Sequence, residues 1–152
     1  MIIRFKNEFA LPVAEVYSYF RTPADWTRLY GLAGVVEDRG DGWFAVPLKR
    51  FPFPLVARNT EQEENKHVRW VFRGFWRGEG EVHLAESSQG VVVEGFEEIS
   101  IRWLFFLSTI VERLFLERRF RTIWEIGWHR LRKREAGGRS ARESQAGQRK
   151  GD

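Results

Sequence analysis

The chain contains no cysteine among its 152 residues. This absence excludes disulfide bonds, metal sites built on thiolates and enzymes that use a cysteine nucleophile. It also removes the most direct sequence indicator of redox compartment, so we expect the cytoplasm by default. The first nine residues, MIIRFKNEF, agree with this expectation, because they alternate apolar and polar side chains and lack the basic segment and apolar core of a secretion signal.

A long uncharged apolar run is missing as well. The most apolar stretch, from Ile99 to Leu116, is interrupted by Arg102, Glu112 and Arg113. A membrane-spanning helix needs about 20 mostly uncharged residues, so this stretch does not predict one.

Motifs for common catalytic chemistry are also absent. The sequence has no H-E-x-x-H and no G-x-S-x-G, and the glycines between residues 74 and 80 have no phosphate-loop lysine beside them. The three histidines, His67, His83 and His129, fall in different predicted elements without a ligand spacing, so we predict no metal site. No catalytic residue is assigned from the sequence, and no cofactor is expected.

Net charge is unevenly distributed along the chain. The total is +4, but residues from His129 onward carry +5 and residues 1–128 carry −1. Residues 136–152 consist of small, polar and charged residues without an apolar anchor, which predicts a disordered basic tail after a folded unit of residues 1–135. Any contact with an anionic membrane or a nucleic acid is therefore expected to be weak and to depend on this tail.

Aromatic residues, by contrast, are abundant. Seven Trp and thirteen Phe are more than a domain of this length needs to fill its core. Two interpretations remain open at this stage, a wide aromatic-lined cavity and a core that happens to favour aromatic side chains.

Hydrophobic periodicity predicts an α+β fold. Ile3, Phe5 and Phe9 alternate with polar residues as in a half-buried strand, and Pro12 then begins a helix that ends before Pro23. A second short helix is expected from residue 24 to Tyr30. Six further strands are predicted at residues 34–39, 43–48, 55–60, 67–73, 79–86 and 90–101. Because every connection is short, we expect one antiparallel sheet of seven strands.

The last predicted element is a long helix over residues 103–135. Its apolar residues recur at spacings of three and four, which is typical of a helix lying on a sheet. They are Leu116, Phe120, Ile123, Trp124, Gly127 and Leu131.

This order of elements, with three local segments, resembles the helix-grip superfamily of START-like domains, polyketide cyclases and Bet v 1-type proteins. The segments are FALPVAEVY at residues 9–17, TPADW at residues 22–26 and WEIGWHRL at residues 124–131. The resemblance covers about residues 2 to 134. It implies a curved sheet around the C-terminal helix and a cavity between them for a lipid, polyketide, quinone or similar molecule. Some members of the superfamily are enzymes, whereas many only bind or carry their ligands.

Candidate ligand-binding residues follow from strand parity and helix faces. Val68, Trp70 and Phe72 share the apolar face of one strand, which must be the inner one. The full set expected to line the pocket is Tyr17, Trp26, Tyr30, Phe44, Phe53, Val68, Trp70, Phe72, Leu84, Phe96, Glu112 and Leu116.

Two carboxylate questions stay open in the sequence. Glu94, Phe96 and Glu98 alternate on the face opposite Val91 and Val93, and only a bulge at Gly95 would turn one of these carboxylates inward. Without the bulge, this is a solvated acidic face.

Glu112 extends the sheet-facing stripe of the long helix, four residues before Leu116. Three positions remain open for its carboxylate: it pairs with an arginine of the sheet such as Arg58, contacts a polar group of a ligand, or reaches solvent at the rim of the pocket.

Three function classes remain. The sequence favours binding or carriage of a small apolar molecule, which needs only an aromatic pocket and a few polar groups. A cyclase- or hydratase-like enzyme would need an acid or base, for which Glu112, Glu94 and Tyr17 are eligible. A surface-docking module would use the basic tail and the apolar segment at residues 103–107.

Overall fold

The computed structural model describes residues 1–32, 34–48, 51, 53–101 and 109–148, without the side chains of residues 109–113, 143–144 and 146–148. The described residues form seven strands, three α-helices and one 3-10 helix. In chain order they are β1 (Ile2–Phe9), α1 (Val13–Tyr17), η1 (Pro23–Asp25), α2 (Trp26–Tyr30), β2 (Glu37–Asp38), β3 (Phe44–Val46), β4 (Leu55–Glu63), β5 (His67–Arg73), β6 (Trp76–Ser87), β7 (Gly90–Ile101) and α3 (Thr109–Gln148).

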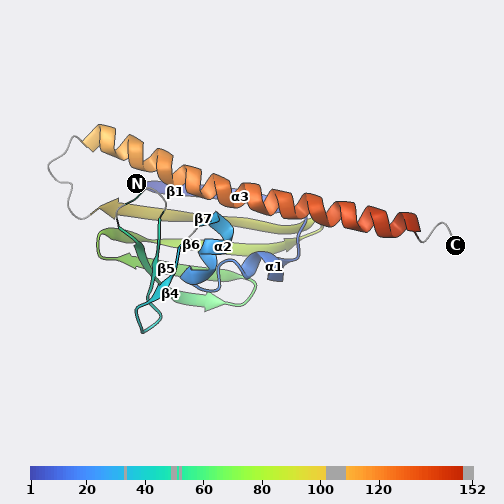
Figure 1. Ribbon diagram of the computed structural model, residues 1–152, viewed down its shortest axis with the longest axis horizontal. Helices are drawn as coiled ribbons and strands as arrows, with labels where there is room; N and C mark the ends of the chain where they lie inside the picture. The colour runs from blue at the N-terminus through green and yellow to red at the C-terminus, as the bar shows by residue number, and fades with distance from the viewer. Residues whose placement is uncertain (33, 49–50, 52, 102–108, 149–152) are drawn as a thin grey trace.

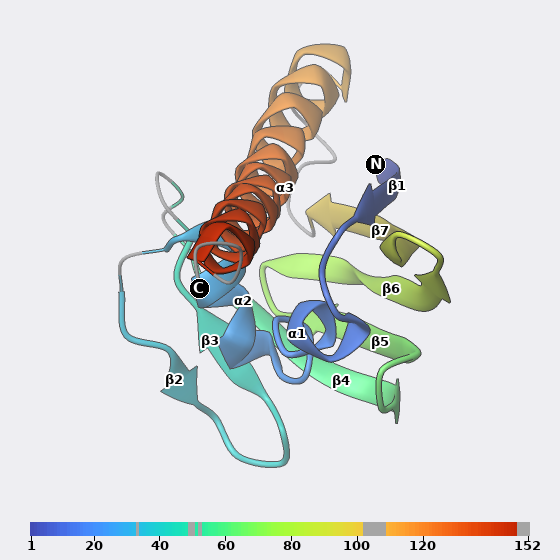
Figure 2. The ribbon, with the colours of Figure 1, turned by 90° about the vertical axis from the view of Figure 1, so that its right-hand side faces the viewer.

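The seven strands form one antiparallel sheet in the order β1-β7-β6-β5-β4-β3-β2. The sheet curves, and α3 crosses its concave side together with the short helices (Figure 2). This confirms the predicted α+β class, the number of strands and the position of the two short helices after the first strand. Strand β6 begins earlier than predicted, because Trp76 already pairs with Ile101 on β7.

Local sequence explains the sharp turns between the short helices. The Thr22 hydroxyl accepts from the backbone N–H of Asp25, and the Asp25 carboxylate accepts from the backbone N–H of Thr22. This reciprocal capping starts η1. Gly31 then ends α2 in the left-handed conformation, with φ of 63°, which a glycine adopts at little cost.

The predicted apolar stripe of α3 lies against the sheet, as expected. Phe120, Trp124 and Leu131 are almost completely buried, and Leu116 and Ile123 are half-buried. Gly127 completes the stripe for a steric reason. A Cβ atom there would lie 3.1 Å from Cγ of Leu29, so the glycine lets α2 approach α3 closely.

Helix α3 continues farther than the sequence predicted. Residues 136–148 are helical rather than disordered, and this part of α3 extends past the edge of the sheet (Figure 1). Glu135, which is buried, accepts from Arg132 at 3.1 Å and from Arg139 on the next turn. These pairs, with the good helix formers Ala, Arg, Glu and Gln, support the extra turns. The predicted helical residues 103–108 lie outside the described residues.

The extended part of α3 should contribute little to stability. We expect a chain that ends at Ser140 to melt within about 2 °C of the full-length protein, because the side chains described beyond that point, Ala141, Arg142 and Gln145, are exposed. A chain that ends at Glu135 also loses the Arg139 pair, which is worth about 1 kcal/mol at most because Arg139 is exposed. Thermal melts followed by circular dichroism measure both differences. A large fall for the chain ending at Ser140 would show that the last turns belong to the folded unit.

None of the helices in the described part of the chain is both long enough and apolar enough to cross a bilayer.

Candidate ligand-binding site

A buried carboxylic acid lies at the centre of the space between sheet and helix. Glu97 is on β7, in the same inner-face series as Val91, Val93 and Ile99, and only 5% of its surface is exposed. Strand β7 pairs with β1 and β6 in continuous register, so Glu97 faces inward without a bulge at Gly95. The sequence thus places one carboxylate on an otherwise apolar face.

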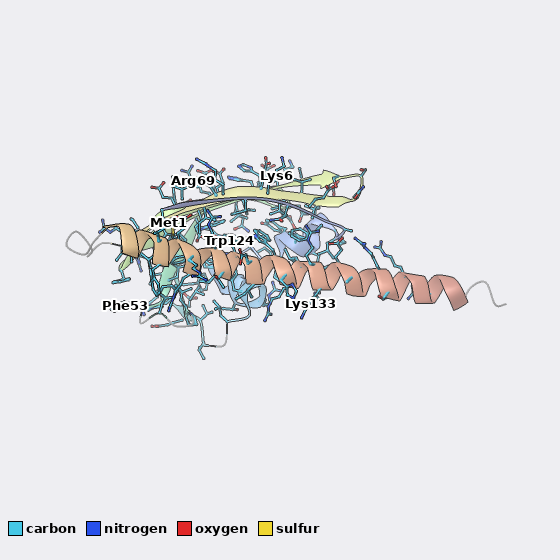
Figure 3. All side chains as sticks on the ribbon, turned by 90° about the horizontal axis from the view of Figure 1, so that it is seen from above. Met1, Lys6, Phe53, Arg69, Trp124 and Lys133 are labelled. Carbon is cyan, nitrogen blue, oxygen red and sulfur yellow. The ribbon has the colours of Figure 1, made fainter. Side chains whose placement is uncertain are left out.

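Trp124 of α3 is the hydrogen-bonding partner of this acid. Its indole Nε1–H donates to Oε2 of Glu97. The indole is held in place by the ring of Phe5 at 4.4 Å and by the ring of Trp128 at 5.1 Å, measured between centroids. Figure 3 shows Trp124 on the side of α3 that faces the sheet, whereas Lys6 and Arg69 point away from the opposite sheet face.

The surroundings of Glu97 favour its protonated form. Burial raises the pKa of Glu97 from 4.5 to about 7, although the hydrogen bond from Trp124 acts in the opposite direction. Burial, together with the negative charge of Glu97, also raises the pKa of Tyr30 well above its ordinary value. A buried carboxyl group whose main perturbation is desolvation is neutral over most of the acidic range.

Two further indole groups lie beside the acid without partners. Nε1 of Trp26, at the start of α2, and Nε1 of Trp70, on β5, are buried and have no hydrogen-bond acceptor among the described residues. The two rings meet edge to face, with centroids 5.3 Å apart. The ring of Trp70 lies directly over Gly80 of β6, where a Cβ atom would come within 2.4 Å of it. Buried donors without acceptors are rare in folded proteins and call for an explanation.

These polar groups line one small enclosed cavity. Its volume is about 10 Å³, which is about the space that one water molecule needs. The lining residues are Trp26, Tyr30, Leu48, Leu55, Trp70, Glu97, Phe120 and Ile123. Aromatic side chains therefore fill most of the space where the helix-grip resemblance implies a cavity.

An open groove lies next to the enclosed cavity. It has a volume of about 410 Å³ and runs between the end of α2 and α3. Its lining residues are Tyr30, Gly31, Leu32, Phe51, Arg119, Thr122, Ile123, Ile126 and Arg130. Tyr30 and Ile123 line both the cavity and the groove, so these two side chains separate the interior from solvent.

Solved structures share the fold of this chain. A crystallised protein from Deinococcus radiodurans matches with a TM-score of 0.62 over 90% of this chain and 98% of its own, at 15% identity. The Aha1 dimer from Colwellia psychrerythraea matches with a TM-score of 0.60 over 86% of this chain and 92% of its own, at 12% identity. A protein from Chromobacterium violaceum matches with a TM-score of 0.61 over 86% of this chain and 94% of its own, at 16% identity.

The chain has the helix-grip fold. No protein-family model matches its sequence, and no curated protein matches it either. The solved structures confirm, at the level of the fold, the helix-grip resemblance expected from the three sequence segments.

Three of the residues predicted to line the helix-grip cavity come together there, namely Trp26, Tyr30 and Trp70. Others lie elsewhere in the core. Val68, Phe72 and Leu84 are buried, as is Tyr17, whose hydroxyl accepts from Nε2 of Gln62 at 2.6 Å. Phe44 and Leu116 are half-buried.

Two predicted residues lie away from the cavity. Phe53 is 46% exposed and stacks on Phe75, with centroids 4.3 Å apart. Phe96 pairs with Glu81 and Arg4 on the outer face, because β7 keeps its alternation through Gly95. The side chain of Glu112 lies outside the described residues, and its proposed partner Arg58 lies over the ring of Trp43 at 4.8 Å.

Sequence reasoning missed the central acid. Glu97 is separated by even intervals from Val91, Val93 and Ile99, so strand parity alone places it among inward-facing residues. The groove residues Phe51 and Arg130 were also missed, since they come from segments far apart in the chain that only the tertiary structure brings together.

Proposed function

We propose that this protein binds a small apolar molecule that carries an acceptor oxygen, such as a ketone or quinone, between the sheet and α3. The observation that carries the proposal is the cluster of Glu97, Trp26 and Trp70 around one enclosed cavity. Ligand sites are mostly apolar, with a few convergent polar groups that fix the ligand's orientation. The helix-grip fold shared with the solved structures gives this space the position in which a ligand is expected.

The chemistry of the cluster selects the ligand group. An indole N–H can only donate, and a protonated carboxyl group also offers one donor. A buried donor without an acceptor costs about 1–3 kcal/mol. A carbonyl oxygen placed near Trp26 and Trp70 would remove this cost, whereas a purely apolar molecule would leave it in place.

The groove provides the route to this interior. Because the enclosed space is only about 10 Å³, a ligand larger than water must displace Tyr30 or Ile123. The outer part of the groove carries Arg119 and Arg130 beside Phe51 and Ile126. A ligand with a carboxylate or sulfonate at its outer end therefore suits this mouth, with its apolar part directed inward.

A charge placed in the groove tests the proposal. Ile126 is 43% exposed and lines the groove, so Ile126→Glu should weaken binding of the fluorescent probe anilinonaphthalene sulfonate by at least about tenfold, or 1.4 kcal/mol. Leu114→Glu is the matched control, because Leu114 is 63% exposed on α3 and lies outside the groove lining. Near-UV circular dichroism checks that both variants remain folded. Equal probe affinities in the two variants would refute the proposed route.

A second candidate function rests on the same acid. A carboxyl group with a pKa of about 7 can both give and take a proton near neutral pH, as a cyclase- or hydratase-like enzyme requires. If a molecule that co-purifies with the protein is converted by it, Glu97→Gln should reduce the rate by about 10²- to 10⁴-fold while binding is retained. Retained turnover in the variant would exclude Glu97 as the catalytic group.

We also propose the cytoplasm as the compartment, and a salt-sensitive contact with anionic surfaces through cationic side chains of α2 and α3. Cationic side chains of Arg28, Arg130, Lys133 and Arg134 line a second, wider groove along this helix. Electrostatic contacts of this type weaken as salt is added.

A further inference from the structure

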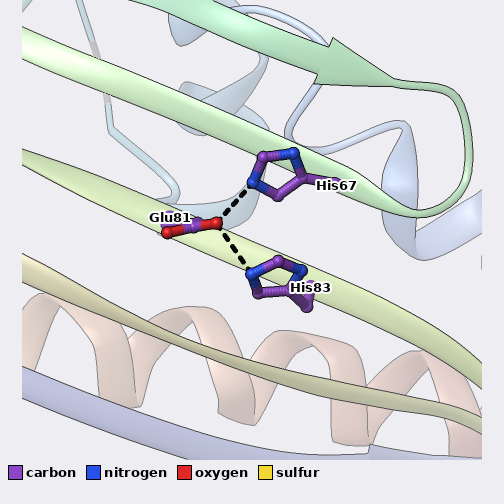
Figure 4. A group of neighbouring side chains, drawn as sticks. All are labelled: His67, Glu81 and His83. Atoms are coloured by element: carbon purple, nitrogen blue, oxygen red, sulfur yellow. Dashed lines mark hydrogen bonds and ion pairs between the residues drawn. The ribbon is translucent and has the colours of Figure 1, made fainter.

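Two histidines and a glutamate meet on the outer face of the sheet. His67 on β5 lies directly opposite His83 on β6 in the antiparallel register. Glu81 precedes His83 by two residues and so points to the same face. Figure 4 shows the three side chains converging, with the carboxylate of Glu81 beside the two rings and a dashed line from it to each ring. The sequence spacing gave no indication of this cluster, because its members come from two strands.

The ligand atoms of the three residues are close together. Oε1 of Glu81 lies 2.6 Å from Nε2 of His67 and 2.8 Å from Nε2 of His83. The imidazole rings stack, with centroids 4.6 Å apart and an angle of 17° between their planes. One nitrogen from each histidine and one carboxylate oxygen all lie within 4.8 Å of one another. A modest adjustment of the side chains would place all three around one ion.

We propose that His67, Glu81 and His83 bind a divalent transition metal ion of the Zn²⁺ class. Two imidazoles and one carboxylate are a donor set that suits Zn²⁺, Co²⁺, Ni²⁺ or Cu²⁺, whereas Ca²⁺ and Mg²⁺ prefer oxygen ligands alone. An ion about 2.0–2.2 Å from each donor would replace the protons that now join the imidazoles to the carboxylate. Three protein ligands leave a fourth position for water or for an external ligand.

Neighbouring charges on the outer face favour a cation at this point. Glu63 on β4 pairs with His67 in the register, and Glu94 on β7 pairs with His83. Their partners are Lys66 at 2.7 Å and Lys6 at 2.9 Å, both strongly exposed. These exposed ion pairs are weak, so the two carboxylates remain able to attract a metal ion.

Another cation on this face, Arg69, is itself neutralised. Arg69 pairs with Glu79 at 2.9 Å and with Glu61 at 3.7 Å.

This site is separate from the proposed ligand cavity. His67, Glu81 and His83 occupy the outer face of β5 and β6, whereas Trp70 and Glu97 point from the inner face of the same sheet toward α3. Failure of one proposal therefore leaves the other untouched, because each is tested with different residues and different probes.

Metal binding is tested on the full-length chain without an affinity tag. Equilibrium dialysis against Zn²⁺ should give one ion per chain at this site, and Co²⁺ should show the visible absorption of an imidazole-coordinated ion. His67→Ala and His83→Ala should each weaken Zn²⁺ binding by at least about tenfold. Loss of a residue that only supports a metal ligand already weakens metal affinity by about 10- to 100-fold, so loss of a ligand itself should cost no less. His129→Ala is the matched control, because His129 is exposed on α3 and lies outside the cluster.

Two further measurements make the result decisive. Glu81→Gln keeps the size of the side chain but removes its charge, so it should weaken Zn²⁺ binding while the far-UV circular dichroism spectrum stays unchanged. Zn²⁺ should also raise the melting temperature of the wild type but not of the His67→Ala, His83→Ala double variant. Absence of Zn²⁺ binding in the wild type, or equal loss in His129→Ala, would overturn the proposal.

Discussion

Replacing Glu97 with glutamine should stabilise the protein at alkaline pH and have little effect in acid. In the unfolded chain this carboxyl group has its ordinary pKa of 4.5, whereas burial in the native state raises the pKa to about 7. The native state therefore binds more protons than the unfolded state between these two values, and the wild type loses stability as pH rises through this range. A pKa difference of this size corresponds to about 3 kcal/mol.

Urea unfolding at several pH values measures this effect. The free energy of unfolding of Glu97→Gln, relative to wild type, should rise by about 3 kcal/mol between pH 4 and pH 8. Glu98→Gln is the matched control, because it removes a carboxylate from the exposed face of the same strand. A constant difference between Glu97→Gln and wild type across the pH range would show that Glu97 is not held as a neutral acid in the core.

Truncating Trp70 should lower the free energy of unfolding by an amount comparable to the increase expected for Glu97→Gln. Only 1% of this side chain is exposed, and it packs against Trp26 and Gly80. Trp70→Ala should lower the free energy of unfolding by about 3–5 kcal/mol, because it removes a large buried ring and leaves a cavity.

Trp70→Phe separates the contribution of the aromatic ring to stability from that of the unpaired indole N–H group. The phenylalanine loses some contact area, but it also removes a buried donor whose desolvation costs about 1–3 kcal/mol. We therefore expect the free energy of unfolding of Trp70→Phe to lie within about 1 kcal/mol of the wild-type value, as the lost contacts and the removed desolvation cost offset each other. A loss as large as that of Trp70→Ala would mean that the indole N–H already has a partner in the ligand-free protein.

Much of the fold was predictable because it depends on short-range patterns. Alternation on β5 and β7, the proline before α1 and the apolar stripe around Phe120 and Trp124 each follow from residues close together in the chain. The extension of α3 beyond Glu135 was not predictable from apolar content, since the side chains described after Glu135 are exposed and one of them, Arg139, pairs with Glu135.

The candidate site was harder to predict because its geometry is long-range. Trp26 and Trp70 could be chosen as inward-facing aromatics, but nothing in their local sequence indicates that the two indole N–H groups lack acceptors. The same holds for the pair His67 and His83, which depends on the register of β5 against β6. Strand parity also contained the position of Glu97, so the sequence could have identified this residue as well.

Competition between two matched probes tests the central claim most directly. Acetylnaphthalene and ethylnaphthalene have nearly the same shape, but only the first has a carbonyl oxygen for the donors around Glu97. Displacement of anilinonaphthalene sulfonate should show that acetylnaphthalene binds the wild type at least about tenfold more tightly, a difference of about 1.4 kcal/mol, and that Trp70→Phe reduces this preference. Equal affinities of the wild type for the two probes would contradict the account.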